Sequence, residues 1–222
     1  MTEQLRSQAS GQRPVFILWT ASGAALLCCA LLLVAGGAEF RHERAVAERP
    51  IFEFVAGYMI AGAVFLATAW FILPRSLAVQ SPQALLFLMI VFGVVMRVVF
   101  FGSVPVQEND FYRYLWDGAL TANGINPWAY SPQAILEGPV TDPDVMMLKA
   151  QAGPVLERIN YGDIRTIYPS LSQAAFAAAY MIKPFSLEAW RGVLLLLELA
   201  TLGLVLLLLL SLNRPLIWSS LY

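Results

Sequence analysis

Several long apolar stretches limit what this chain can fold into. A helix that crosses a bilayer needs roughly 20 mainly apolar residues, and five stretches reach or approach that length. The sequence therefore predicts an all-α protein, a polytopic bundle of about five transmembrane helices. The predicted spans are residues 14–37, 51–73, 84–104, a weaker 169–185, and 187–210.

Composition supports a membrane protein and excludes some functions. Of 222 residues, 59% are hydrophobic and 13% are charged, whereas soluble domains carry roughly 25% charged residues. A net charge of −1 gives no reason to expect nucleic acid as a partner. A single histidine, His42, leaves no basis for a histidine metal centre or a histidine-dependent triad.

The fourth apolar stretch differs from the others because it is short and rich in alanine. Ala174 and Ala178 lie four residues apart, a spacing that lets helix backbones approach closely in a membrane. We expect this helix to pack inside the bundle.

One connection, residues 105–168, is long and polar. It contains eight of the fifteen acidic residues, and its prolines favour loops between short interfacial helices over a separate folded domain. The expected organisation is a polar tail with three spans (1–104), an external catalytic-type loop (105–168), and two further spans (169–222). With a cytoplasmic N-terminus, this connection lies on the non-cytoplasmic face.

Residues 108–118 concentrate three carboxylates, one arginine and four aromatic side chains directly after a predicted span. Asn109 or Asp110 is a natural N-cap for a helix that runs to about Thr121. At about 100° per residue, one face of this helix carries four polar or ionisable residues. They are Asp110, Arg113, Tyr114 and Asp117.

The other faces of this helix carry apolar side chains. We expect Phe111, Leu115 and Trp116 to enter the membrane interface, where aromatic residues are favoured. This pattern predicts an amphipathic helix on the membrane surface, with its charged face turned into a cavity. A solvated face with ordinary ion pairs, each contributing about 0.2–0.5 kcal/mol, is the alternative.

The spacing of the charges separates their possible roles. Glu108 and Asp110 flank one residue, so they can act on one atom or on one divalent cation, Mg²⁺ or Mn²⁺, when a phosphate adds ligands. Arg113 can hold a phosphate or orient Asp110. Arg97, inside the third span, either extends its charge to the interface or points toward Glu108 and Asp110 or an anionic ligand.

Four motifs follow one another in this order: Asn-Asp-Phe-Tyr-Arg-Tyr-Leu-Trp-Asp-Gly (109–118), Gly-Ile-Asn-Pro-Trp-Ala-Tyr-Ser-Pro (124–132), Ile-Asn-Tyr-Gly (159–162) and Thr-Ile-Tyr-Pro (166–169). This series resembles bacterial mannosyltransferase-like members of the GT-C superfamily. Those proteins are polytopic glycosyltransferases that use polyprenyl-phosphate sugars. The similarity covers roughly residues 85–222.

The resemblance implies roles for particular residues. Asp110 matches the catalytic base, with Glu108 assisting it or binding a metal. Arg113 or Arg97 would bind the donor phosphate. Substrate contacts would come from Tyr114, Asp117, Asn126 and Tyr168.

The implied activity is transfer of a hexose, mannose above all, with inversion, from a polyprenyl-phosphate donor to a lipid or glycan hydroxyl. The expected location is the bacterial inner membrane. Members of the superfamily usually have ten or more spans, so we expect this chain to be an N-terminal fragment.

Two other functions are compatible with the sequence. A transporter or flippase of a lipid-linked precursor usually places charges near the bilayer midplane, where only Glu198 is predicted to lie. An inactive membrane subunit is the second alternative, and the coding sequence after Tyr222 would test it.

Overall fold

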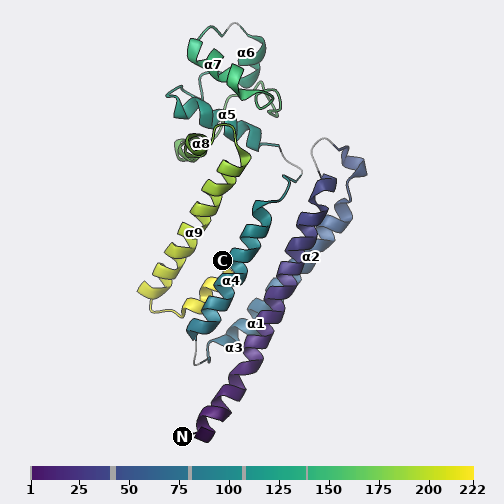
Figure 1. Cartoon of the computed structure of the whole chain (residues 1–222), viewed down its shortest axis with the longest axis vertical. Coiled ribbons are helices and arrows are strands. Elements are labelled where there is room, and N and C mark those ends of the chain that lie inside the picture. Colours follow the sequence, from purple (N-terminus) through teal and green to yellow (C-terminus); the bar gives the residue numbers. More distant parts are fainter. Residues whose placement is uncertain (1, 41–43, 80–81, 107–108, 139) are drawn as a thin grey trace. The chain divides into compact units, whose positions relative to one another are not determined.

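The computed structural model describes residues 2–40, 44–79, 82–106, 109–138 and 140–222. Helices make up its regular structure, and the described residues contain no strand (Figure 1), so the all-α prediction is confirmed. The α-helices are α1 (Thr2–Gly36), α2 (Ile51–Ala67), α3 (Leu73–Ser76), α4 (Pro82–Phe101), α5 (Phe111–Ala122), α6 (Pro132–Glu137), α7 (Pro143–Ala152), α8 (Ser170–Ile182) and α9 (Leu187–Ser211). Short 3-10 helices cover Gly37–Phe40, Val46–Glu48 and Leu216–Leu221, and a π-helical turn, Thr68–Ile72, joins α2 to α3.

Four helical segments in the described part of the chain are long and apolar enough to cross a membrane. The shortest has 20 residues, which at 1.5 Å per residue spans about 30 Å, the thickness of the hydrocarbon core. The prediction of a polytopic membrane protein is therefore confirmed. The four segments are Arg13–Phe40, Ile51–Ser76, Pro82–Phe101 and Leu187–Ser211.

The expected fourth span is wrong. Helix α8 has 13 residues, a length of about 20 Å, which is too short to cross the bilayer. It ends at Ile182 because Lys183 adopts extended backbone angles, φ −154° and ψ 113°, as expected for a residue that precedes a proline. The predicted span, residues 169–185, had included residues on both sides of this helix.

The expected packing of α8 is also corrected. Helix α8 lies against α5, and its buried face includes Gln173, Phe176 and Ala177. Ala174 and Ala178 are exposed. The alanine pair chosen from its spacing is therefore on the wrong face of the helix.

The chain forms two compact units. Unit 1 comprises Met1–Val106 with Leu199–Tyr222, and unit 2 comprises Gln107–Glu198. In unit 1, α1 packs against α2 and α4. A Cβ atom on Gly23 would lie 2.6 Å from the ring of Phe92, so glycine allows α1 and α4 to approach closely.

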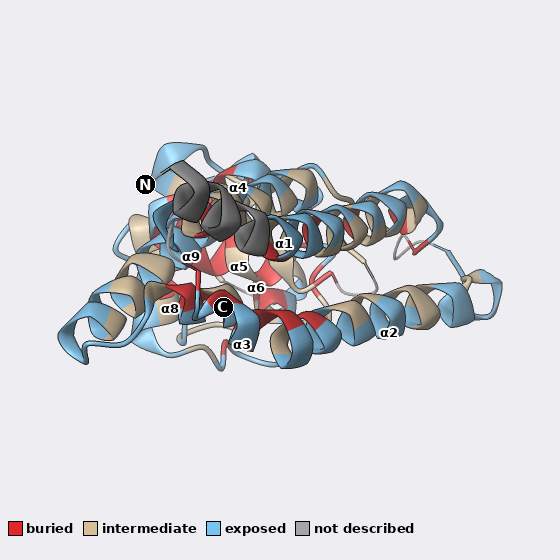
Figure 2. Ribbon diagram, turned by 90° about the horizontal axis from the view of Figure 1, so that it is seen from below, coloured by how far each residue is buried: buried red, intermediate tan, exposed pale blue. Residues whose placement is uncertain are grey.

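Much of the surface of the spans is apolar and exposed. Helix α2 has no buried residue, and Figure 2 draws it in the exposed and intermediate colours. Phe52 and Met59 on α2 are 82% and 69% exposed. Such a surface is suited to contact with the lipid chains of a membrane.

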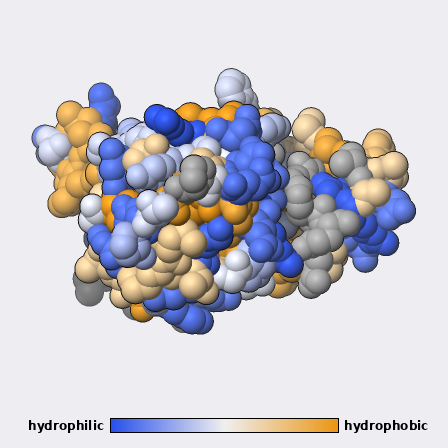
Figure 3. All heavy atoms as spheres, turned by 90° about the horizontal axis from the view of Figure 1, so that it is seen from above, coloured by the Kyte–Doolittle hydropathy of each residue, from blue (hydrophilic) through white to orange (hydrophobic). Residues whose placement is uncertain are grey.

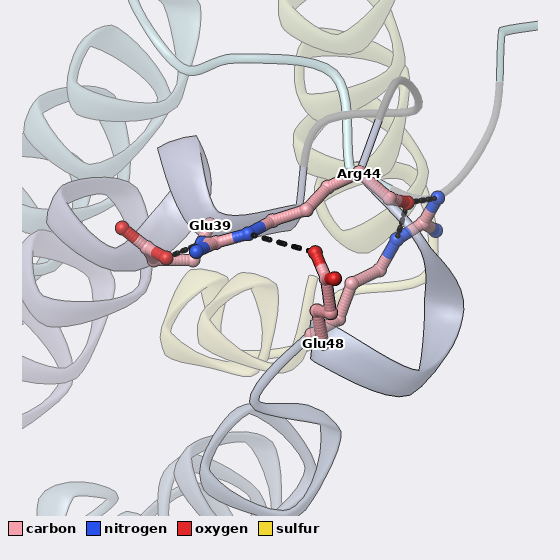
Figure 4. A network of polar contacts seen from close by, with 4 residues as sticks. Glu39, Arg44 and Glu48 are labelled. Atoms are coloured by element: carbon pink, nitrogen blue, oxygen red, sulfur yellow. Dashed lines mark hydrogen bonds and ion pairs between the residues drawn. The ribbon is translucent and has the colours of Figure 1, made fainter.

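Polar contacts organise the turn between α1 and α2 (Figure 4). Arg44 pairs with Glu39, and its Nε lies 4.0 Å from a carboxylate oxygen of Glu48. Arg49 donates hydrogen bonds from Nε and Nη2 to the carbonyl oxygen of Arg44, at 3.0 and 2.7 Å. The side chains of the two ion pairs are exposed, so each pair contributes at most about 1 kcal/mol.

Unit 2 has a hydrophobic core of its own, built around α5. Seven of the twelve residues of α5 are buried. Leu115 and Trp116 are 6% and 1% exposed, so the expectation that they enter the membrane interface is wrong. They pack among buried residues of α6, α7 and the segment after α7, including Ile135, Val145, Leu148, Ala152 and Leu156.

The polar connection thus contains short helices, as expected, and these helices share a hydrophobic core. Several apolar side chains of unit 2 nevertheless remain on its surface, among them Met147, Ile167 and Leu171. One view of the molecular surface shows hydrophilic and apolar residues intermixed (Figure 3).

Candidate functional site

The candidate site begins where α5 begins. Asp110, one of the two residues predicted for the N-cap position, occupies it through its backbone: its carbonyl oxygen accepts hydrogen bonds from the amides of Arg113 (2.9 Å) and Tyr114 (3.3 Å). Its side chain makes no capping hydrogen bond and is half-buried. The carboxylate is therefore not engaged in holding the end of the helix.

A loop from further along the chain is hydrogen-bonded to residues on both sides of Asp110 in the sequence. Asn109 donates from Nδ2 to the carbonyl oxygen of Arg158 at 2.9 Å, and its Oδ1 accepts a hydrogen bond from Asn160. Arg113 donates from Nη2 to the carbonyl oxygen of Tyr161 at 3.1 Å. Local sequence patterns had not indicated that Asn109 organises the site in this way.

Arg113 carries a buried positive charge, with the residue only 8% exposed. Burial lowers the pKa of its guanidinium, and this effect is opposed chiefly by Asp117, then by Tyr168, Asp110 and Asp163. The guanidinium therefore lies within electrostatic reach of Asp110, as its predicted role requires. Whether it binds a phosphate stays a prediction.

Asp117 is almost fully enclosed, at 1% exposure. Burial raises the pKa of its carboxyl, while hydrogen bonds from Thr166 and Gln173 and the charge of Arg113 act in the opposite direction. Gln173 donates from Nε2 to Asp117 Oδ2 at 3.3 Å and to Thr166 Oγ1 at 3.0 Å. The visible role of Asp117 is to join α5 to α8, and its expected contact with substrate stays a prediction.

Gln173 is a residue that the sequence argument missed. It is 1% exposed, and its Oε1 also accepts a hydrogen bond from Thr121 Oγ1 at 3.3 Å. A glutamine inside an otherwise apolar helix is the signal that would have identified it, because buried polar groups need partners.

Two of the predicted substrate-binding residues lie together. The ring centroids of Tyr114 and Tyr168 are 5.2 Å apart, and Tyr114 stacks on Phe176 at 4.8 Å. Trp190 completes this aromatic cluster. Asn126 lies instead in the loop after α5, is exposed, and accepts the amide of Trp128 at 3.0 Å, which closes a turn.

Glu108 and Arg97 are the two remaining residues predicted for the site. Glu108 lies outside the described residues. Arg97 belongs to unit 1, where its Nη1 donates to the carbonyl oxygen of Gly93 at 3.2 Å and its guanidinium lies 5.4 Å from the ring centroid of Tyr222. Its role in binding an anionic ligand stays a prediction.

Unit 1 contains a cavity of about 450 Å³, which Arg97 helps to line. Most of the other lining residues are apolar, for example Leu26, Phe65 and Phe92.

A divalent cation is neither supported nor opposed. Among the described residues, no three histidine, cysteine or acidic side chains are grouped so that they could hold a metal ion. Asp110 is the described member of the pair predicted to bind Mg²⁺ or Mn²⁺, so that prediction remains open.

Residues 15–154 match the model of a protein family described as alpha-(1->6)-mannopyranosyltransferase, N-terminal domain. The match covers more than half of the 222 residues. The chain belongs to this family. Its members are glycosyltransferases, so the resemblance seen in the sequence is confirmed at the level of a membrane mannosyltransferase with a sugar donor and an acceptor.

The match to the mannosyltransferase family includes α5 and Asp110 but ends before the loop that holds Tyr161. No curated protein and no solved structure matches the chain.

Proposed function

We propose that this mannosyltransferase moves a mannosyl group, with inversion, from a polyprenyl-phosphate donor to a hydroxyl of a lipid or glycan acceptor. The observation that carries the proposal is the Asp110 carboxylate at the start of α5, half-buried and free of any capping role. Arg113 supplies a nearby buried cation.

The reaction needs one base. Asp110 takes the proton from the acceptor hydroxyl as its oxygen attacks the anomeric carbon of mannose. The bond from that carbon to the phosphate oxygen breaks, and its electron pair leaves with the phosphate. Attack from the face opposite the leaving group inverts the configuration at the anomeric carbon.

Arg113 stabilises the charge that develops on the departing phosphate, an electrostatic effect that usually dominates catalysis. Its hydrogen bond to the carbonyl oxygen of Tyr161 uses one of the five N–H groups of a guanidinium. Within the described part of the chain, its other guanidinium N–H groups make no hydrogen bond, so they can donate to a phosphate oxygen.

The donor is a lipid, and we place its prenyl chain against the spans. Helix α8 is too short to cross the bilayer, so a cytoplasmic N-terminus puts the whole segment between α4 and α9 on the non-cytoplasmic face. We propose the bacterial inner membrane as its location, because the resemblance to bacterial mannosyltransferase-like proteins implies it.

Membranes that contain the protein, incubated with radiolabelled polyprenyl-phosphate mannose or with nucleotide-linked mannose, test the donor. We expect label to enter an acceptor only from the lipid-linked donor, and the product to have the opposite anomeric configuration. Transfer from the nucleotide sugar alone, or retention of configuration, would contradict the proposal.

Two further measurements complete the experiment. Addition of a chelator tests the predicted use of Mg²⁺ or Mn²⁺ by Glu108 and Asp110. If the protein moved the lipid-linked sugar across the membrane of sealed vesicles without covalent change, a transporter would instead be favoured.

A further inference from the structure

The backbone of Tyr161 adopts a left-handed conformation, with φ 52°. This region is unfavourable for a bulky L-residue, because Cβ approaches the following carbonyl oxygen. The ring of Tyr161 does not offset this cost by packing, since the residue is 76% exposed.

Two other non-glycine residues among those described have positive φ, and both have an ordinary explanation. Phe185, with φ 54°, packs its ring against the core of unit 2 and lies edge-on to Tyr180 at 5.3 Å. Asn213, with φ 51°, is of a residue type that tolerates this conformation. Tyr161 is the case that neither packing nor residue type explains.

The backbone on either side of Tyr161 is held in place by other residues. The carbonyl oxygen of Tyr161 accepts from Arg113 and from the amide of Ile164, at 3.1 and 3.0 Å. The carbonyl oxygen of Gly162 accepts from the amide of Gln133 at 2.8 Å. The loop thus keeps its conformation without help from the Tyr161 ring.

The same contacts place the loop beside the candidate base. Asn109 precedes Asp110 in the chain and binds both Arg158 and Asn160, whereas Arg113 follows it by one helical turn and binds Tyr161. The loop that carries Tyr161 and the start of α5, which carries Asp110, are therefore adjacent in unit 2.

We propose that the ring of Tyr161 is a stacking platform for a pyranose ring at the transfer site. Asn109 and Arg113 act as positioning residues that hold this ring beside Asp110. The apolar C–H face of a pyranose packs on an aromatic face, and the phenolic hydroxyl remains at the wet edge for a hydrogen bond. This inference rests on the proposed function, and it adds the residue that holds the sugar.

Two substitutions separate the ring from the backbone. Tyr161→Phe keeps the aromatic face, whereas Tyr161→Asn removes it and tolerates the left-handed conformation. We expect the asparagine variant to unfold at the wild-type temperature or above it, because strain is relieved, and yet to lose about tenfold in kcat/KM, the scale of one aromatic contact. The phenylalanine variant should lose less kcat/KM than the asparagine variant, because it keeps the stacking face and lacks only the phenolic hydroxyl.

The matched control is Phe185→Asn, which also replaces an aromatic residue by asparagine at nearly the same φ. It should lower the unfolding temperature, because the ring of Phe185 packs in the core. The KM for the donor is measured at saturating acceptor, and the KM for the acceptor at saturating donor. The substrate whose KM rises in Tyr161→Asn is the one whose sugar contacts Tyr161.

Binding of methyl α-mannoside, followed by ligand-detected NMR on the detergent-solubilised protein, gives a readout that needs no turnover. The signal should be present in wild type and Tyr161→Phe and lost in Tyr161→Asn. Equal binding and equal kinetics in the asparagine variant, or no binding to wild type, would overturn the proposal. Binding by wild type without mannosyl transfer would contradict the proposed function alone.

Discussion

A Cβ atom on Gly118 would lie 2.4 Å from the carbonyl oxygen of Phe176. Helices α5 and α8 are therefore closer at this point than any residue other than glycine permits. This contact fixes the position of α8, which carries Gln173, relative to α5, which carries Arg113 and Asp117. The candidate site depends on this contact, although the contact itself includes no ionisable group.

Gly118→Ala should separate α5 from α8. Because the clash is with backbone atoms, which cannot rotate away, we expect a loss of about 1–3 kcal/mol in the free energy of unfolding. Thermal unfolding in detergent measures the change. The matched control is Gly192→Ala on α9, where a Cβ meets nothing within 4 Å; it should be neutral or stabilise the helix by up to about 1 kcal/mol. Equal behaviour of the two variants would show that the close contact is absent.

Gln173→Leu should destabilise unit 2, although leucine is of similar size and suits an apolar helix. It removes the amide that donates to Asp117 and Thr166, and a buried group left without a partner costs about 1–3 kcal/mol. Denaturant unfolding followed by tryptophan fluorescence measures this loss. Gln151→Leu, on the exposed surface of α7, should change stability by no more than about 0.5 kcal/mol. A stable Gln173→Leu variant would argue against the hydrogen-bond network.

Asp117 predicts a specific dependence of stability on pH. Burial raises the pKa of its carboxyl in the folded protein above the ordinary value of 3.8. Its contribution to stability is therefore complete below that ordinary value and is lost as pH rises through the higher folded-state pKa. Asp117→Asn cannot titrate and should lack this loss.

The free energy of unfolding of wild type and Asp117→Asn, measured from pH 4 to pH 8, checks this prediction. The free energy of unfolding of wild type, relative to that of the asparagine variant, should fall as pH rises. Parallel curves of unfolding free energy against pH would mean that burial does not raise the pKa of Asp117.

Much of the fold could be predicted because its causes are local. Four apolar stretches long enough to cross a bilayer gave four spans, and the polar start at Asp110 marked the beginning of α5. Helix α8 shows the limit of hydropathy, because Pro184 fixes Lys183 in an extended conformation and ends the helix early. Trp116 shows a second limit, since an aromatic residue near a membrane suits the interface and a protein core equally well.

The site was predicted less completely, because its contacts are non-local. Asn109 and Asn160 are 51 residues apart in the chain, and Asp117 and Gln173 are 56 apart. Spacing along one helix cannot reveal such partners. The residues of α5 were identified from their pattern, while Gln173, Thr166 and the loop at Tyr161 required the folded structure.

The kcat/KM for mannosyl transfer from polyprenyl-phosphate mannose by Asp110→Asn tests the central claim most directly. Asparagine keeps the size of the side chain but cannot take a proton, so we expect kcat/KM to fall about 10²–10⁴-fold with unchanged thermal unfolding. Asp163→Asn is the matched control, because Asp163 also acts electrostatically on Arg113 but has no proposed role in proton transfer; it should retain most of the activity. Wild-type rates in a folded Asp110→Asn protein would contradict the assignment of Asp110 as the base.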